Sequence, residues 1–236
     1  MRILVTNCNT TEAMTKEIET GARAAASPGT EIVALTPKWG PESAEGWLDS
    51  FLSAAAVLDL LRSTEETFDA VVLAGFGEHG REGARELLDV PVVDITEAAA
   101  HLATLLGRRF GVVTTLDRTC GLIEDSLYSA GVDRNCVAVA GSGLNVLELR
   151  DEERTEAALV SAGQRVIDAG AEVLVLGCAG MTGLDRTMSA LLDVPVVDGV
   201  AAAVRLAESL VALGLRTSRA GSYARPLDKH RTWPGG

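Results

Sequence analysis

The sequence of 236 residues contains no run of about 18 uncharged apolar residues, so we expect no segment that spans a membrane. It also has no long run of basic side chains among its 21 Lys and Arg residues, and its formal net charge is −12. Nucleic-acid phosphates are bound by clustered basic side chains, so we expect no nucleic-acid partner. The first residues, Met1–Asn7, enter a strand-like run without the apolar region of a signal peptide. We therefore expect a soluble, cytoplasmic protein.

The four cysteines, Cys8, Cys120, Cys136 and Cys178, have no C-x-x-C spacing and no histidine nearby in the sequence. This pattern predicts neither a zinc site nor a disulfide framework. In a reducing compartment the four residues should be free thiols. We expect no metal and no cofactor.

Short apolar runs alternate with segments of helical periodicity, which predicts an α/β fold with parallel sheets and crossover helices. We expect Thr10 and Thr11 to cap the first helix, and Thr96 to precede a helix over Glu97–Leu106 that stops at Gly107. The expected strands are Arg2–Thr6, Glu31–Leu35, Ala70–Ala74, Val92–Ile95, Phe110–Thr114, Cys136–Ala140, Glu172–Leu176 and Val196–Asp198. A last helix, Val200–Leu213, should stop at Gly214.

An internal repeat organises the chain: Leu-Leu-Asp-Val-Pro-Val-Val-Asp stands at 87–94 and again at 191–198. Each copy follows an apolar strand that ends in a glycine-rich turn, and aligning these turns places Gly75 opposite Cys178. The runs 3–7 and 111–115 open the two halves. We predict two pseudo-symmetric halves, each a four-stranded parallel sheet flanked by helices. The first is 1–107 with part of the C-terminal helix region 199–236, and the second is 108–198.

The predicted active site lies in the cleft between these halves. Ligands of open parallel sheets bind outside the carboxyl ends of the strands, so the turns after the first and third strand of each half should converge. These turns are residues 7–9, 75–79, 114–120 and 177–181.

Cys178 is the leading candidate for chemistry. It lies beside Gly177 at an expected strand-to-helix turn, where helix amide groups would favour an anion and lower the thiol pKa. The alternative is a small buried residue that fills a tight turn. We favour the functional interpretation because the turn belongs to the repeat.

Other residues of these turns could bind a substrate or move a proton. The backbone N–H groups of Phe76, Gly77, Ala179 and Gly180 would point into the cleft, where they could hold a carbonyl or carboxylate and stabilise an enolate. The alternative is that such glycine-rich ends only permit tight turns. Substrate contacts are expected from residues of all four turns: Asn7, Asn9, Gly75, Phe76, Gly77, Thr114, Thr115, Gly177, Ala179 and Gly180.

His79 follows the first glycine-rich turn and could be an acid or base near neutral pH, or a helix-start residue that faces solvent. Cys8 and Cys120 lie in matching regions of the two halves, so either could reach the cleft. We treat both as structural or reserve thiols. Cys136 should serve packing.

These residues together resemble the aspartate/glutamate/hydantoin racemase superfamily, particularly its hydantoin and allantoin racemase branch, over nearly the whole chain. The resemblance rests on Arg-Ile-Leu-Val with Asn-Cys-Asn-Thr-Thr near the start, Gly-Arg-Arg-Phe at 107–110, Leu-Gly-Cys-Ala-Gly-Met at 176–181, Val-Pro-Val-Val-Asp at 194–198 and Glu-Ser-Leu-Val-Ala-Leu-Gly at 208–214. It implies a homo-oligomer that transfers protons without a cofactor, at a carbon next to a carbonyl. In the family, one cysteine removes the proton from one face of this carbon and a second cysteine returns it on the other.

The chain departs from this branch at two positions. The branch usually has Ala-Cys-Phe-Gly-Asp-Pro-Gly where this chain has Ala-Gly-Phe-Gly-Glu-His-Gly, so its first catalytic thiol is replaced by Gly75. A cysteine, Cys8, stands where the branch has proline. Arylmalonate decarboxylase, a more distant relative, resembles this chain in having glycine at the first position and a single cysteine in the second half.

The sequence leaves several functions open. Cys178 and a substitute partner, with His79 favoured, could racemise a hydantoin-like cyclic amide. Cys178 alone could deliver a proton after decarboxylation, or could act as a covalent nucleophile. A binding or regulatory protein that keeps the cleft without the chemistry is a fourth interpretation.

Overall fold

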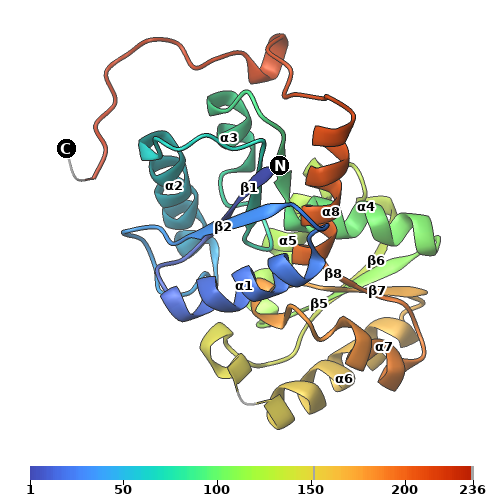
Figure 1. Cartoon of the computed structure of the whole chain (residues 1–236). Helices are drawn as coiled ribbons and strands as arrows, with labels where there is room; N and C mark the ends of the chain where they lie inside the picture. The colour runs from blue at the N-terminus through green and yellow to red at the C-terminus, as the bar shows by residue number, and fades with distance from the viewer. Residues whose placement is uncertain (151, 235–236) are drawn as a thin grey trace.

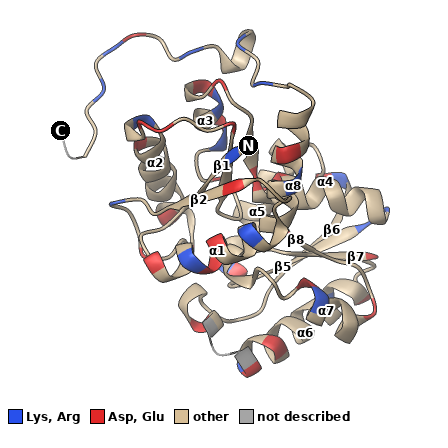
Figure 2. Cartoon of the chain, viewed as in Figure 1, with Lys and Arg blue, Asp and Glu red and all other residues tan. Residues whose placement is uncertain are grey.

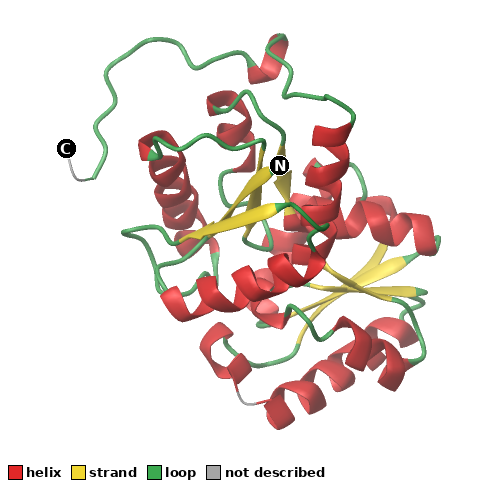
Figure 3. Cartoon of the chain, viewed as in Figure 1, coloured by secondary structure: helices red, strands yellow, loops and turns green. Residues whose placement is uncertain are grey.

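Two four-stranded parallel sheets form the frame of the protein (Figures 1 and 3), here described from a computed structural model that covers residues 1–150 and 152–234. The first sheet has the order β2-β1-β3-β4 and the second the order β6-β5-β7-β8, which is the same arrangement. The strands are β1 (Arg2–Asn7), β2 (Glu31–Leu35), β3 (Ala70–Ala74), β4 (Val92–Asp94), β5 (Phe110–Thr114), β6 (Cys136–Gly141), β7 (Val173–Leu176) and β8 (Val196–Asp198). The predicted α/β architecture with a repeated sheet is confirmed.

Eight α-helices and five short 3-10 helices are present among the described residues. The α-helices are α1 (Glu12–Ala25), α2 (Trp47–Ser63), α3 (Arg81–Leu87), α4 (Ile95–Leu106), α5 (Cys120–Ser129), α6 (Glu152–Asp168), α7 (Asp185–Leu192) and α8 (Gly199–Ala212). The 3-10 helices are η1 (Asp117–Thr119), η2 (Asp133–Asn135), η3 (Val146–Arg150), η4 (Ala179–Met181) and η5 (Gly221–Tyr223). None of the described helices is long and apolar enough to cross a membrane.

Successive side chains of a strand point to opposite faces of its sheet, and the buried apolar side chains form three hydrophobic cores. In β1, Ile3 and Val5 enter a central core that also contains residues of α1, α4 and α8, while Leu4 packs toward α2 and α3. In β5, Val112 faces the same central core and Val113 packs toward α6 and α7. Because both faces of each sheet are covered, the inner strands are apolar throughout. Figure 2 shows charged residues mainly on the helices and loops around the two sheets.

The strand register gives the equivalence of the two halves residue by residue. Ile3 pairs with Ala70, and Phe110 pairs with Val173. With the glycine-rich turns aligned, Ile3 therefore matches Phe110. The sequence comparison, which matched Ile3 with Gly111, was wrong by one residue because consecutive valines and threonines leave the register ambiguous.

The last helix connects the two halves. α8 follows the second sheet but contacts β3, β4, α1 and α4. The Glu208 carboxylate accepts hydrogen bonds from Ser27 N at 2.7 Å and Thr30 Oγ1 at 2.6 Å, which ties α8 to the turn before β2. The domain boundaries stay predictions, and residues 235–236 of the expected first domain lie outside the described residues.

Helix α4 begins two residues earlier than predicted, because its cap is Asp94 and not Thr96. The Asp94 carboxylate accepts from the N–H groups of Thr96 and Glu97, and the Glu97 side chain bonds back to Asp94 N, which completes a capping box. The Asp198 carboxylate caps α8 by accepting from the N–H groups of Val200 and Ala201, so this helix starts at Gly199.

Helix α1 starts after Thr11, but the Thr11 hydroxyl makes no capping bond and donates instead to the carbonyl of Glu42. Thr10 likewise donates its hydroxyl to the carbonyl of Pro41 and does not cap the helix. The two threonines therefore hold the loop before α2. Gly107 is the C-cap of α4, as predicted, and Gly214 follows α8 with a φ of 69°.

Candidate active site

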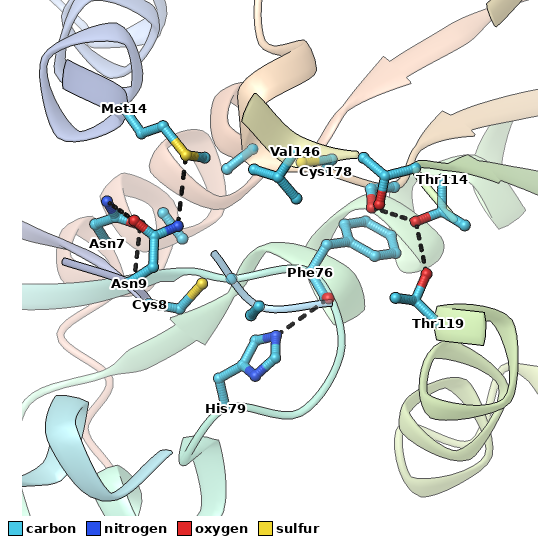
Figure 4. A pocket seen from close by; sticks show the side chains of 16 residues that line it. Asn7, Cys8, Asn9, Met14, Phe76, His79, Thr114, Thr119, Val146 and Cys178 are labelled. Carbon is cyan, nitrogen blue, oxygen red and sulfur yellow. Dashed lines mark hydrogen bonds between the residues drawn. The ribbon is translucent and has the colours of Figure 1, made fainter. Parts of the chain in front are cut away.

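A cavity lies where the two sheets present the carboxyl ends of their strands to each other (Figure 4). All four predicted turns contribute, so the expected convergence is confirmed. The cavity is lined by Asn7, Cys8, Asn9, Met14, Ala44, Ala74, Gly75, Phe76, His79, Thr114, Thr115, Thr119, Val146, Gly177, Cys178 and Ala179.

The structure brings every predicted site residue to this cavity except Gly77 and Gly180. Cys8 also lines it, whereas Cys120, at the start of α5, does not. Sequence reasoning missed Met14, Ala44 and Val146. Met14 comes from α1, Ala44 from the loop before α2 and Val146 from η3, and no periodicity predicts that these segments reach the cavity.

Cys178 follows β7 and occupies the N-cap position of η4. Burial raises the pKa of its thiol to about 11, the Gly180 N–H bonded to the sulfur lowers it, and the charge of Glu45 raises it. The predicted low pKa is thus wrong: η4 has only three residues, and the next α-helix starts at Asp185. The resting form of Cys178 near neutral pH is the thiol.

Cys8 directly follows β1 and is buried. Burial raises the pKa of its thiol to about 12, and the charges of Cys178 and Asp94 raise it further. Because Cys8 and Cys178 interact electrostatically, ionisation of one opposes ionisation of the other. The cavity therefore favours at most one thiolate at a time.

His79 is buried, so the alternative of a solvent-facing residue is wrong. Its Nδ1 lies 3.2 Å from Ser50 Oγ and its Nε2 lies 3.3 Å from the carbonyl oxygen of Phe76. Burial lowers the pKa of His79, while the nearby charge of Glu78 raises it. We therefore expect a neutral imidazole whose two nitrogens both face protein groups.

The backbone donors differ from the prediction. The N–H of Gly77 donates to Thr96 Oγ1 at 2.8 Å and is not free for a substrate, and the N–H of Gly180 acts on the Cys178 sulfur and lowers the pKa of that thiol. The N–H groups of Phe76 and Ala179 remain, and neither donates to another of the described residues. These two residues come from opposite halves of the chain.

Asn7 and Asn9 have different roles in the wall of the cavity. The Asn7 amide donates to Asn9 Oδ1 at 3.0 Å and to Thr15 Oγ1 at 3.1 Å, and so it braces the turn. The Asn9 amide faces the Met14 sulfur at 3.5 Å (Figure 4), a weak acceptor that leaves the amide available for a ligand.

The two threonines of the second half also differ. The Thr114 hydroxyl donates to the carbonyl of Gly177 at 3.1 Å and so braces the turn that carries Cys178. The buried Thr115 hydroxyl has no partner among the described residues and lines the cavity. It can therefore donate to or accept from a bound molecule.

Known proteins are similar to this chain over nearly its whole length. A sequence model of the family Asp/Glu/Hydantoin racemase matches residues 3–207. The hydantoin racemase of Pseudomonas sp. (strain NS671) is 41% identical over 232 residues, which cover 97% of this chain and 93% of that protein. The crystal structure of allantoin racemase from Pseudomonas fluorescens superposes with a TM-score of 0.96 at 55% identity, and covers 98% of this chain and 100% of that one.

A more distant likeness concerns the fold alone. The crystal structure of arylmalonate decarboxylase has a TM-score of 0.61 and 18% identity, and covers 91% of this chain and 94% of that one.

Family and branch follow from these matches, which extend over nearly the whole chain and over both glycine-rich turns of the cavity. The chain belongs to the Asp/Glu/hydantoin racemase family, in its hydantoin racemase-like branch, and it is a racemase.

Proposed function

We propose that this racemase inverts 5-substituted hydantoins, cyclic ureides that include allantoin, by proton transfer at ring carbon 5. Carbon 5 is bonded to a carbonyl carbon, so loss of its proton gives an enolate. The proposal is supported by similarity to a hydantoin racemase and an allantoin racemase over nearly their full lengths.

The proposed substrate class is supported by the charges in and near the cavity. No Lys, Arg, Asp or Glu lines it among the described residues. The charge of Glu45 nevertheless reaches Cys178 and raises the pKa of its thiol. A lining without a basic side chain, reached by this negative charge, disfavours a free amino-acid carboxylate. An uncharged ring pays no such penalty.

In the proposed reaction, the thiolate of Cys178 removes the proton from one face of carbon 5. The N–H groups of Phe76 and Ala179 can donate to the enolate oxygen, where such donors stabilise developing charge. Asn9 and Thr115 can bind the amide groups of the ring. Racemisation also needs an acid on the opposite face, for which His79 and Cys8 are the candidates that line the cavity.

One observation favours a second function. Gly75 stands where the resemblance to the branch places a first catalytic cysteine. If Cys178 is the sole acid, the chain would protonate an enolate on one face only, after a decarboxylation. We therefore include an arylmalonate among the test compounds.

The test is to follow the circular dichroism of single enantiomers with purified protein, an enzyme-free blank and the variant Cys178→Ser. We expect the signals of 5-methylhydantoin and allantoin to decay with wild-type protein, and those of glutamate and aspartate to persist. Cys178→Ser should lose the activity, because a serine hydroxyl is a far weaker acid than a thiol. Decay with the amino acids alone would contradict the substrate class, and release of CO₂ from phenylmalonate without racemisation would favour the decarboxylase.

The homo-oligomeric state and the cytoplasmic location, expected from the sequence, stay predictions. Sedimentation equilibrium of the purified chain tests the first of these. A mass at the monomer value of 24.7 kDa at micromolar concentration would contradict it.

A further inference from the structure

We propose that Cys8 is the second acid–base group of this site, and that it acts from β1 in place of a thiol at position 75 on β3. The inference rests on the proposed racemase mechanism at Cys178. It assigns the opposite face of the substrate to a residue on a different strand from the one that the family pattern indicates.

Cys8 and Gly75 are neighbours across the first sheet. β1 and β3 are parallel neighbours, and their last paired residues are Asn7 and Ala74. The next residue on each strand is Cys8 and Gly75, so the two positions lie side by side at the carboxyl edge of the first sheet. A thiol can therefore move from one strand to its neighbour and stay at the same level of the cavity.

The Cys8 side chain leaves no room for a side chain at position 75. A Cβ atom built on Gly75 would lie 2.7 Å from Cys8 Cβ and 2.9 Å from Cys8 Sγ. The φ angle of Gly75 is outside the left-handed region, so the backbone itself admits a side chain and only the space is missing. Cys8 thus occupies the space that a cysteine at position 75 would need. In this chain the two thiol positions exclude each other.

The pseudo-symmetry of the halves supports the same pairing. In the second sheet, β5 and β7 are in register at Val113 and Leu176, which places Thr115 beside Cys178. The pair Thr115 and Cys178 thus corresponds to the pair Cys8 and Gly75. Each half presents one thiol to the cavity, from its third strand in one case and from its first strand in the other.

His79 is less suited to the same task. Both of its ring nitrogens face protein groups, Ser50 Oγ and the carbonyl of Phe76. The atom that faces a Cβ at Gly75 is the ring carbon Cδ2, at 2.5 Å. Figure 4 shows the ring joined to the Phe76 carbonyl, below the Cys8 sulfur. We assign His79 as a positioning residue of the turn that carries Phe76.

The proton balance of the two-thiol reaction closes without any other reactant. The Cys178 thiolate takes the proton from carbon 5, and the electron pair of the broken C–H bond enters the enolate. The Cys8 thiol then donates its proton to the opposite face, forms the new C–H bond and becomes the thiolate. This final state, with the proton on Cys178, is the one that acts on the opposite enantiomer. It holds a single negative charge, as the coupling between the thiols favours.

The experiment compares Cys8→Ser, Cys178→Ser and His79→Asn in D₂O, with each enantiomer of 5-methylhydantoin supplied separately. We expect both serine variants to lose racemisation by about 100-fold or more, the scale of one acid–base group. Each should still exchange deuterium into one enantiomer with retained configuration, and the two variants should act on opposite enantiomers. His79→Asn should be slowed but should still racemise. Cys136→Ser, at a thiol that does not line the cavity, is the matched control for loss of a cysteine.

Two results would overturn the proposal. The first is racemisation by Cys8→Ser at the wild-type rate. The second is that His79→Asn, and not Cys8→Ser, exchanges deuterium into one enantiomer only. If the wild-type protein acts on no cyclic ureide, the proposed function fails, and the placement of the thiols is then tested by cross-linking. 1,3-Dibromoacetone should bridge Cys8 to Cys178, as seen by peptide mass spectrometry, in wild-type protein and Cys136→Ser. Absence of that bridge would contradict the facing arrangement whatever the substrate.

Discussion

The hydroxyl of Thr96 binds both backbone groups of Gly77: it accepts from the Gly77 N–H at 2.8 Å and donates to the Gly77 carbonyl at 3.1 Å. All of these groups are buried. The contact fastens the start of α4 to the turn after β3, which carries Gly75 and Phe76 into the cavity. In the second half Asp198 does the equivalent work, because its carboxylate accepts from Thr182 Oγ1 at 2.6 Å and from Gly183 N at 2.7 Å.

Thr96→Val should therefore destabilise the protein by about 2 to 3 kcal/mol, since it leaves two buried backbone groups unpaired. Racemisation should fall in parallel because the turn loses its support. Urea denaturation and the rate with 5-methylhydantoin measure the two effects. Thr96→Ser, which keeps the hydroxyl, is the control. Equal stability of the valine variant and the wild type would show that the contact is not needed.

Gly75→Ala should destabilise the protein by about 1 to 3 kcal/mol, as expected for an added carbon in a filled space. Its Cβ would meet His79 Cδ2 at 2.5 Å and Cys8 Cβ at 2.7 Å. Combining it with Cys8→Gly should cost less than the sum of the two single changes, because the second change vacates part of that space. A double-mutant cycle by denaturation measures this coupling. Strict additivity would mean that Cys8 and position 75 do not compete.

The raised pKa of Cys178, about 11, predicts slow reaction with iodoacetamide at neutral pH. A thiol with this pKa is ionised to about one part in ten thousand at pH 7, and the thiolate fraction rises about tenfold per pH unit. The alkylation rate of Cys178 should therefore increase steadily up to about pH 10. Peptide mass spectrometry of timed samples gives the rate. A plateau near pH 8 would show a thiol activated as a helix N-terminus would activate it.

Because His79 is buried in its neutral form, the free energy of unfolding should decrease in acid. Its pKa is lowered in the folded protein, so below the usual value near 6.5 the unfolded chain takes up a proton that the folded chain does not. Stability should thus fall as the pH falls from about 6.5, by at most about 1.4 kcal/mol per pH unit for this one group. His79→Gln should have a shallower decline than wild type between pH 6.5 and 5, and His101→Gln, at an exposed residue, should not. Identical slopes for the wild type and His79→Gln would contradict this cause.

Much of the fold could be predicted because apolar runs and glycine-rich turns recur in the same order in both halves. Every predicted strand limit was within one residue of the structure. The start of α4 was missed although its signal was in the sequence: Asp94 and Glu97 have capping-box spacing, and Asp is a stronger N-cap residue than Thr96, which is also a cap by residue type. The Thr11 side chain is used by a loop residue distant in sequence, Glu42, which no local pattern reveals.

The part of the site that lies at the ends of strands could be predicted from the sequence. Parallel strands bring their carboxyl ends to one edge, so Asn9, Thr115 and Cys178 were placed correctly in one cavity. The pKa of Cys178 could not be predicted, because it depends on burial by both halves and on the short η4. The competition between Cys8 and position 75 needed the register of β1 against β3, and a single sequence does not state that register.

The most direct test of the account is the fate of deuterium in one early turnover. A single enantiomer of 5-methylhydantoin is incubated with wild-type protein in D₂O, and at low conversion the two enantiomers are separated and examined by proton NMR. The two-thiol mechanism predicts that the newly formed enantiomer carries deuterium at carbon 5 while the remaining starting enantiomer keeps its proton, because different groups serve the two faces. Deuterium in the starting enantiomer with no inversion would contradict it and would show a single acid–base group.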